Sequence, residues 1–452
     1  MPGDQDEEPL EPLLHGVRVL DFGRYIAGPF CAAMLGDLGA EVIRIERLAG
    51  SEDRYICPVM DSGEGALFLQ VNRNKKSVTL NPMKPEGRAV VKRLVKSADV
   101  VVANMPVDGL REMGLDLESL RAIRPDIILS SQTAFGDAGP YAHRPGFDGV
   151  AQAMSSATFM SGYPDAPTKS YASWCDFSTA FVAAYGTVAA LMYRQKTGRG
   201  QEVKANLLRT ALNIFQFNNI EAYLLGRVRE PSGNRSQFGG PGDLFRTTDG
   251  WVQAQGVGQP LFVRWCEMIG ARHWLEDPRF ANDKQRSLNS QVLNERMQQW
   301  VGQFSSAEAL SRLARSSIPA GPLLSPLQAL DDAQVVQTDM LTWVDCSGPV
   351  QTGAAGVRAG GVLGYGRRHP AASADAGRTY RPGAGKCRLF GTGDKRPARS
   401  QNRLKTFNWR YSCRVCWKEK SLLSPARARA WARVLPWRPR ARARRSSSTT
   451  WA

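Results

Sequence analysis

The chain has 452 residues, enough for two domains with substantial cores. Its formal net charge of +17 would suit a nucleic-acid-binding protein, but the basic excess is confined to one segment. Residues 361–452 carry 23 Lys or Arg against 3 Asp or Glu, whereas residues 1–360 carry 36 against 39. The body of the chain is therefore mildly acidic, which argues against nucleic-acid binding by that part.

The basic segment 361–452 has no apolar period of a helix or a strand, and Arg alternates with Ala and Pro over 425–445. Two interpretations are open: a basic interaction arm, or the product of out-of-frame translation of a GC-rich gene. We favour the second. We therefore expect this tail to be aberrant, disordered and unnecessary for the function of the body.

Targeting and metal-binding signals are weak. Residues 1–12 are acidic and lack the basic and apolar regions of a signal peptide. The apolar run 177–193 is interrupted by Ser, Thr and Gly, which favours a core helix over a membrane span. Cys413 and Cys416 have no second Cys or His pair at metal-ligand spacing, so a zinc site is not expected, and Cys175 is expected to be a small core residue. We expect a cytoplasmic protein without a membrane segment.

The first half of the chain alternates short apolar strands with helical segments, which predicts an open, parallel, Rossmann-like α/β sheet. Dinucleotide binding is not expected, because no G-x-G-x-x-G motif follows any of the strands. The predicted strands are 17–22, 40–46, 77–80, 99–103, 127–131 and 201–205, and the predicted helices are 28–38, 86–97, 117–123 and 208–225.

The second half predicts a smaller α+β domain. A Gly-, Ser- and Arg-rich loop precedes a hairpin over 244–254 that turns at Asp249-Gly250, and helical segments follow. The expected organisation is a large domain over 13–226, a small domain over 227–317, an incomplete return to the large domain over 318–360 and the tail over 361–452.

Asp176 is the most informative single residue. It lies in SWCDFST, residues 173–179, just before an apolar helical stretch. An acidic residue there is either a helix N-cap or a reactive carboxylate. The two roles are compatible, because the helix dipole favours the ionised form that a nucleophile needs.

Several long motifs, taken together and in this order, resemble the family III CoA-transferases, the formyl-CoA transferase and carnitine CoA-transferase (CaiB/BaiF-like) group. The resemblance runs from residue 14 to about residue 345. Its motifs are GVRVLDF at 16–22, AGPFCAAMLGDLGAEVIRIER at 27–47, VNRNKKSVTLN at 71–81, ADVVVAN at 98–104, GPYAHRPGFDGVAQA at 139–153, KTGRGQEV at 196–203 and FRTTDGWV at 245–252.

The resemblance implies that Asp176 is the catalytic nucleophile of an acyl-CoA:carboxylate CoA-transferase. Its carboxylate would form a mixed anhydride and then an aspartyl-CoA thioester, which a small carboxylic acid attacks. Coenzyme A would be a co-substrate, with no permanently bound cofactor and no metal. The resemblance also implies an interlaced homodimer of ring-like chains.

Four residues are implied to contact coenzyme A: Arg47 near the nucleotide phosphates, Asn104 near the amides of pantetheine, and Lys75 and Lys76 as cations that steer the anionic substrate. Arg47 as a solvated charge, Asn104 as a turn residue and solvated lysines on a loop are the alternatives.

The substrate pocket is expected to include Tyr25, Ile26, Phe147 and Phe238, with Gly239 and Gly240 in a loop that closes over the site or in a plain flexible linker. These side chains are apolar, which suggests a larger or aromatic acid. Some members of the family have Gln at the position of Ile26. The usual Leu-Gly-Glu-His-Thr ending of the family is missing here.

Two other functions stay open. An α-methylacyl-CoA racemase is expected to need His directly after Gly146, but this chain has Phe147, and His143 lies four residues early. A phenyl ring cannot exchange a proton, so the sequence favours a transferase over a racemase. A basic-tailed nucleic-acid-binding or inactive protein is the other alternative, supported by the tail alone.

Overall fold

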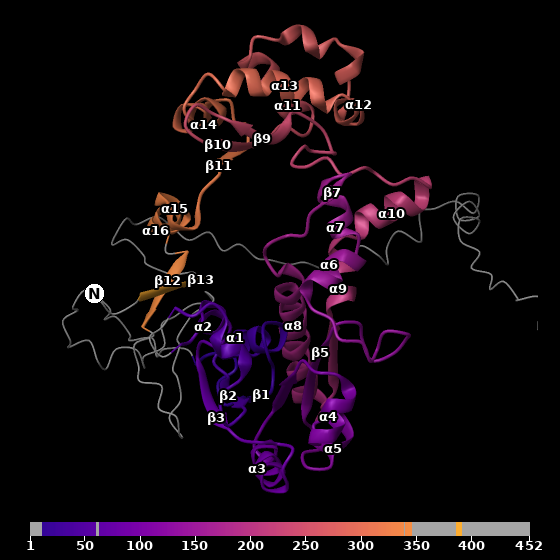
Figure 1. Ribbon diagram of the computed structural model, residues 1–452, viewed down its shortest axis with the longest axis vertical. Coiled ribbons are helices and arrows are strands. Elements are labelled where there is room, and N and C mark those ends of the chain that lie inside the picture. Colours follow the sequence, from indigo (N-terminus) through magenta and orange to yellow (C-terminus); the bar gives the residue numbers. More distant parts are fainter. Residues whose placement is uncertain (1–10, 60–62, 339, 346–385, 391–452) are drawn as a thin grey trace, which may run out of the picture. The chain divides into compact units, whose positions relative to one another are not determined.

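The computed structural model describes residues 11–59, 63–338, 340–345 and 386–390, and Figure 1 labels the helices and strands. Its main feature is a six-stranded sheet in the order β3–β2–β1–β4–β5–β8, in which every neighbouring pair is parallel. The expected parallel α/β sheet is thus confirmed. The strands are β1 Arg18–Asp21, β2 Glu41–Glu46, β3 Lys75–Thr79, β4 Val100–Ala103, β5 Ile128–Thr133 and β8 Glu202–Asn206.

Both faces of this sheet are covered, so its central strand β4, VVVA, is continuously apolar and buried. Alternate residues of β4 point to opposite faces. Val100 and Val102 pack with α1 and α8, whereas Val101 and Ala103 pack with α3, α4 and α5. The covering helices are α1 Ala27–Asp37 and α8 Trp174–Thr197 on one face, and α3 Pro85–Lys96, α4 Val107–Met113 and α5 Leu117–Arg121 on the other.

The strand order reverses direction between β1 and β4. From β1 the chain proceeds through β2 to β3 on one side, and then returns to β4 on the other side of β1. In open α/β sheets, ligands bind outside the carboxyl ends of the strands at such a switch point. The segments that follow β1 and β4 are therefore the first place to look for a site.

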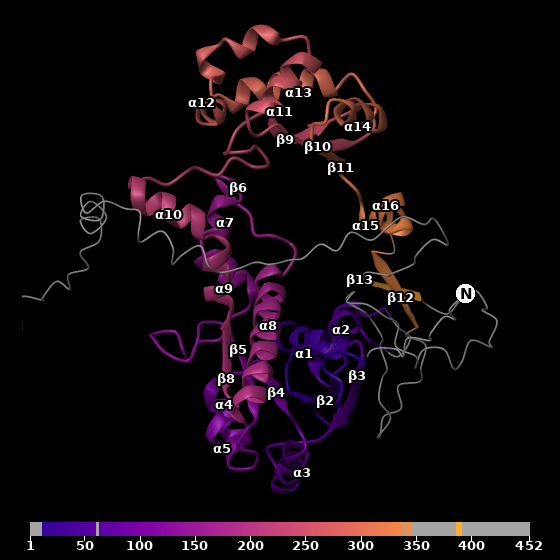
Figure 2. The ribbon, with the colours of Figure 1, turned by 180° about the vertical axis from the view of Figure 1, so that it is seen from behind.

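The longest helix is α8, with 24 residues. By length and composition alone it could cross a membrane, but it also fits the description of a core helix, since residues such as Ala180 and Ala183 are fully buried. It packs against α1, β5 and β8, and it lies beside α1 in both views (Figures 1 and 2). This packing agrees with the core helix expected from the sequence.

Beyond β8 the helical stretch 208–225 is divided, not continuous. Helix α9 covers Leu207–Ile214 and α10 covers Gln216–Leu225, with Phe215 between them at ψ 8°. Shorter elements that the sequence did not predict lie between β1 and α8: α2 Ala66–Val71, α6 Asp148–Met154, α7 Ala157–Met160, β6 Gly162–Tyr163, β7 Ala166–Pro167 and the 3₁₀ turn Glu52–Tyr55.

A second hydrophobic core forms around the predicted hairpin, which does turn at Asp249-Gly250. Its buried centre includes Phe262, Trp265 and Phe280. A third strand pairs with the hairpin. The elements are β9 Gly242–Arg246, β10 Trp251–Gln255, β11 Ala320–Pro322, α11 Gln259–Met268, α12 Asp283–Leu288, α13 Ser290–Val301, α14 Ser306–Arg315 and the 3₁₀ turns Arg272–Leu275 and Pro278–Phe280.

The last described elements are α15 Pro326–Asp331, α16 Ala333–Gln337, β12 Leu341–Asp345 and β13 Lys386–Phe390. Strands β12 and β13 pair in antiparallel register. The prediction that no ordered element follows residue 361 is therefore wrong for these five residues, because a two-stranded ladder satisfies backbone groups without any apolar period. The predictions for residues 361–385 and 391–452 lie outside the described residues.

Candidate functional site

Asp176 is the third residue of α8, and Ser173 occupies the N-cap position. The N-cap role considered for Asp176 is therefore wrong. The Asp176 carboxylate makes no hydrogen bond or ion pair within the described residues, although the residue is largely buried. It is thus available to react with a bound molecule.

The backbone of Asp176 is held by a second carboxylate. The Asp176 N–H donates to Oδ2 of Asp148, the first residue of α6, at 3.0 Å. The other oxygen of Asp148 accepts from the Gln152 side chain, whose own Oε1 accepts the Ser170 N–H at 2.9 Å. Gln152 also donates to the Ala172 carbonyl at 3.3 Å. Asp148 and Gln152 therefore fix residues 170–176 from α6.

The same environment makes Asp176 unusually basic. Burial, and second the nearby charge of Asp148, raise the pKa of Asp176 from 3.8 to about 7. This is opposite in sign to the dipole effect expected from the sequence, so desolvation and like-charge repulsion outweigh the helix N-terminus here. A carboxyl group that titrates near neutrality is typical of functional sites.

Small apolar residues surround this first turn of α8. Ala27 of α1, Ala151 of α6, Cys175 of α8 and Leu207 of α9 form one buried cluster. Cys175 is fully buried, and burial with the neighbouring carboxylates raises its thiol pKa far above the ordinary value. As expected, Cys175 is a core residue, and its thiol stays protonated.

The loop after β1 is fixed by side chains from two other segments. Both amide atoms of Asn104, just beyond β4, bond the backbone of Arg24: Oδ1 accepts its N–H and Nδ2 donates to its carbonyl, each at 2.7 Å. The next N–H, of Tyr25, donates to Asp53 Oδ2 at 2.8 Å, and Tyr25 is held at φ +60°. Gly28 permits this close packing, because a Cβ there would lie 2.9 Å from the Gly23 backbone. Asn104 thus anchors the loop, and because each of its amide atoms can make one further hydrogen bond, its contact with pantetheine stays a prediction.

Beneath this loop lies a buried network of charges. Arg44 binds both oxygens of Asp53 at 2.9 Å and Asn72 at 2.8 Å. Lys75 donates to Asp21 at 2.8 Å, to Asn72 at 2.9 Å and to the Pro29 carbonyl at 2.7 Å. Lys75 is only 3% exposed, and burial lowers its pKa to about 8. The expectation of a solvated lysine that steers substrate is therefore wrong for Lys75, since it lies in β3 with its ammonium enclosed.

Two of the predicted cations are exposed. Lys76 points away from Lys75, because side chains alternate along β3, and it pairs with Glu41. Arg47, directly after β2, pairs with Glu52 at 3.3 Å, and Arg24 binds the same carboxylate at 2.9 Å. Arg24 and Arg47 therefore form a cationic pair at the carboxyl ends of β1 and β2. Arg24 is not among the coenzyme A contacts predicted from the sequence.

The predicted aromatic residues of the substrate pocket lie in two different places. Tyr25 and Phe147 are in edge-to-face contact, with ring centroids 5.6 Å apart, and Phe147 immediately precedes Asp148. Ile26 is buried at the start of α1. A Cβ on Gly146 would lie 2.7 Å from that of Ala134, so only glycine lets this turn approach the end of β5. Tyr25 and Phe147 thus lie on the two segments that flank the Asp148–Asp176 contact.

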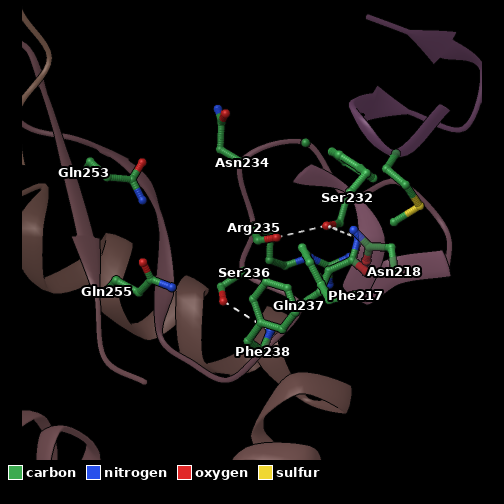
Figure 3. Close-up of a pocket in the computed structure, with 13 residues that line it drawn as sticks. Phe217, Asn218, Ser232, Asn234, Arg235, Ser236, Gln237, Phe238, Gln253 and Gln255 are labelled. Carbon is green, nitrogen blue, oxygen red and sulfur yellow. Dashed lines mark hydrogen bonds between the residues drawn. The ribbon is translucent and has the colours of Figure 1, made fainter. Parts of the chain in front are cut away.

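Phe238 lines a separate pocket of about 260 Å³, shown in Figure 3. Its ring packs against Phe217 with centroids 5.5 Å apart. The other lining groups are mainly amides and hydroxyls, with Arg235 as the cation among them, a composition that suits a ligand bearing a carboxylate. Asp176 is not among the lining residues.

Gly239 and Gly240 are buried against the second core, not in an open linker. A Cβ at Gly239 would lie 3.0 Å from Oδ1 of Asp283, and one at Gly240 would lie 3.0 Å from Cδ1 of Leu293. The flexible-linker alternative is therefore wrong for these two residues, because close packing explains why they are glycines.

The position of His143 bears on the racemase alternative. His143 is exposed and pairs with Asp108 at 3.1 Å, with Phe147 in the position a racemase histidine would need. Among the residues that the structure describes, no group of three or more His, Cys, Asp or Glu side chains could hold a metal ion.

The fold and this site define an α/β enzyme with a buried carboxylate as its candidate reactive group. Residues 14–375 match the family model described as CoA-transferase family III, which extends about 30 residues past the resemblance seen in the sequence. The chain belongs to CoA-transferase family III.

Curated relatives and solved structures agree with this assignment. The chain is 32% identical over 333 residues to the succinate–glutarate CoA-transferase of Agrobacterium fabrum, covering 72% of this chain and 83% of the relative. It is 30% identical to the acetyl-CoA:oxalate CoA-transferase of Acetobacter aceti, covering 72% and 84%. A crystal structure of a CAIB/BAIF family protein from Brucella suis is 30% identical, with a TM-score of 0.67, covering 77% of this chain and 95% of that one.

Proposed function

We propose that this enzyme transfers coenzyme A from an acyl-CoA to a free carboxylic acid by covalent catalysis at Asp176. An Asp176 oxygen attacks the thioester carbonyl carbon, the carbon–sulfur bond breaks, and CoA thiolate leaves an aspartyl–acyl anhydride. The thiolate then attacks the aspartyl carbonyl of that anhydride and releases the donor acid as its carboxylate. The acceptor carboxylate displaces CoA from the resulting aspartyl thioester, and the thiolate returns to the acceptor acyl group. No net oxidation occurs, and Asp176 is regenerated.

The unpaired, largely buried carboxylate of Asp176 is the observation that carries this proposal. A carboxylate already paired with a cation would lose that interaction on acylation, whereas Asp176 has no such partner among the described residues. Its raised pKa makes it a better nucleophile than an ordinary aspartate, while it is still substantially ionised near pH 7. The buried surroundings also limit access of water, which would hydrolyse an anhydride.

For coenzyme A, the exposed arginines at the ends of β1 and β2 are the supported contacts. Arg47 and Arg24 share Glu52, and an incoming phosphate could replace that carboxylate as their partner. Lys76 stays a predicted contact, exposed on β3. Asn104 acts by holding the loop that carries Tyr25.

For the acids, relatives are named as transferases acting on succinate and glutarate, D-citramalate or oxalate, so we propose succinyl-CoA as the first donor to test. Tyr25 and Phe147 are proposed to contact the acyl group, since they flank the Asp148–Asp176 contact. A panel of dicarboxylates and aromatic monocarboxylates as acceptors then measures how much the aromatic pair favours larger acids.

We also propose that the enzyme is an interlaced homodimer. Helix α10 buries none of its residues within the described part of one chain, yet it carries Ile220, Tyr223 and Leu224. An apolar helix surface of this kind is typical of a protein–protein interface.

The decisive experiment replaces Asp176 by Asn. Turnover should fall by about three orders of magnitude or more, because the amide cannot form the anhydride, while the affinity for free CoA should change little. Asp165→Asn is the matched control, because it makes the same chemical change in an exposed turn between β6 and β7 and should leave turnover intact. If Asp176→Asn keeps its turnover, Asp176 is not the nucleophile and the proposal fails.

A further inference from the structure

We propose that Asp148 is the positioning residue of the nucleophile: it holds the turn that carries Asp176 through its hydrogen bonds, and its negative charge sets the pH range in which Asp176 reacts. This inference rests on the proposed role of Asp176. Asp148 acts on Asp176 in two ways: it accepts a hydrogen bond from the Asp176 backbone N–H, and its charge repels the ionised Asp176 carboxylate.

The geometry assigns both tasks to one buried carboxylate. Asp148 is 6% exposed, and its two oxygens accept from the Asp176 N–H and from the Gln152 amide. Gln152 is 1% exposed and bonds both Ser170 and Ala172. The segment that leads into α8 is thus attached to α6 at three backbone positions. A purely structural anchor would need acceptors here, but it would not need a charge.

The charge is the feature that calls for a functional explanation. A neutral amide could also accept the Asp176 N–H, although less strongly, and it would avoid placing two carboxylates close together in a largely buried site. Asp148 instead disfavours the ionised nucleophile. The benefit is reactivity, because a more basic carboxylate is a stronger nucleophile. A pKa near the working pH gives the best compromise between basicity and the fraction of the carboxylate that is ionised.

No other charge compensates for this repulsion within the described residues. Ala27 of α1 and Leu207 and Ala211 of α9 supply apolar contacts, and Cys175 is a protonated thiol. Lys169 lies in the same segment, but its ammonium donates to the Ser170 carbonyl. In the part of the chain that the structure describes, Asp148 is therefore the one charged group that acts on Asp176.

The first test is Asp148→Asn, with the rate of donor-acid release from acyl-CoA measured in single turnover between about pH 5 and 9. Loss of the charge should move the acid midpoint of this rate down by about half a pH unit or more, with the burial effect remaining. The limiting rate above the midpoint should fall by about 2- to 10-fold, because the nucleophile becomes less basic. Asp165→Asn should leave the midpoint unchanged.

A second variant restores the hydrogen bonds to the Asp176 and Ser170 N–H groups and between positions 148 and 152, and it loses the 3.3 Å bond to the Ala172 carbonyl. In Asp148→Asn/Gln152→Glu, the Asn oxygen still accepts the Asp176 N–H, and its amide donates to the carboxylate introduced at position 152. That carboxylate still accepts the Ser170 N–H. The negative charge is then one side chain farther from Asp176. The midpoint of the double variant should lie between those of the wild type and Asp148→Asn, with the fold retained by circular dichroism.

An equal loss of rate at every pH, with an unchanged midpoint in a folded variant, would overturn the inference and leave Asp148 a structural anchor only. If Asp148→Asn alone does not fold, the double variant decides: a midpoint below that of the wild type supports the inference, and an unchanged midpoint overturns it. These outcomes do not test the proposed function, because the proposed function fails only if Asp176→Asn still transfers CoA.

Discussion

At the scale of single residues, the site depends on two carboxylates with different surroundings. The Asp148 carboxylate accepts hydrogen bonds from two donors, whereas the Asp176 carboxylate accepts none from the described residues. Both are acidic residues near helix N-termini, so sequence position alone does not distinguish them. Their different roles come from which backbone and side-chain groups face them.

The raised pKa of Asp176 has a cost in stability. Its pKa is about 7 in the folded protein against 3.8 for the ordinary side chain, so the folded state binds this proton more tightly than the unfolded chain does. The contribution of Asp176 to stability is therefore lost as the pH rises through this range. Asp176→Asn should increase the free energy of unfolding by about 2 kcal/mol or more at pH 8, with no difference below about pH 4.

Urea unfolding of the wild type and of Asp176→Asn at both pH values measures this. The variant should be more stable and inactive at pH 8, a combination typical of a functional residue held in an unfavourable environment. Equal stability at pH 8 would show that the carboxylate is solvated well enough to keep an ordinary pKa.

Other single residues show what the sequence could and could not reveal. Asp176 was recognised because a long apolar helix follows it. Asp148 was missed although it lies in one of the quoted motifs, because α6 has only seven residues and no clear apolar period. Lys75 was misplaced because two consecutive lysines suggest a solvated loop, and only the three-dimensional contacts with Asp21 and Asn72 explain a buried one.

At the scale of elements, the loop after β1 shows how the switch point of the sheet becomes a site. Strands β1 and β4 are neighbours, so the residues that follow them meet, and Asn104 closes the gap by bonding Arg24 twice. Tyr25 adopts a left-handed backbone conformation that is uncommon for a residue with a bulky side chain, and Asp53 holds it there. The loop is thus rigid before any substrate binds.

Asn104→Ala tests this anchoring role. Two hydrogen bonds to Arg24 are lost in a half-buried place, so the free energy of unfolding should fall by about 1–3 kcal/mol. Asn213→Ala is the control, because Asn213 is exposed on α9 and its side chain makes no hydrogen bond within the described residues. Unchanged stability in Asn104→Ala, with weaker CoA binding alone, would restore the pantetheine contact as its main role.

The strands β1, β2 and β4 were predictable because each contains a short apolar run, and the alternation with helices indicated parallel pairing. The boundaries of helices were less predictable, as the division of α9 and α10 at Phe215 shows. The short elements between β5 and α8 were not predicted, because their order depends on contacts with distant segments and not on local pattern. These are the elements that carry Phe147 and Asp148.

At the scale of the whole molecule, one chain leaves a large apolar surface on α10. Tyr223 is 88% exposed and Leu224 is 71% exposed. Single exposed apolar residues are ordinary, but a helix with several of them and no buried residue in the described part of the chain is not.

Ile220→Glu/Tyr223→Glu should therefore shift the enzyme from a dimer toward a monomer, because two charges would be buried in the interface. Light scattering of the purified protein gives the mass directly. Gln299→Glu, exposed on α13, is the control and should leave the mass unchanged. A wild-type mass equal to one chain would remove the dimer proposal.

The position of α8 in the chain has a consequence for biosynthesis. This helix is apolar enough to resemble a membrane span, and a nascent segment of that kind is exposed to aggregation. However, α1, β1, β4 and β5, which line the core against which α8 packs, all precede it in the chain. Synthesis proceeds from the N-terminus, so the surface that covers α8 has left the ribosome before α8 itself does, and only β8 remains to be added to the sheet.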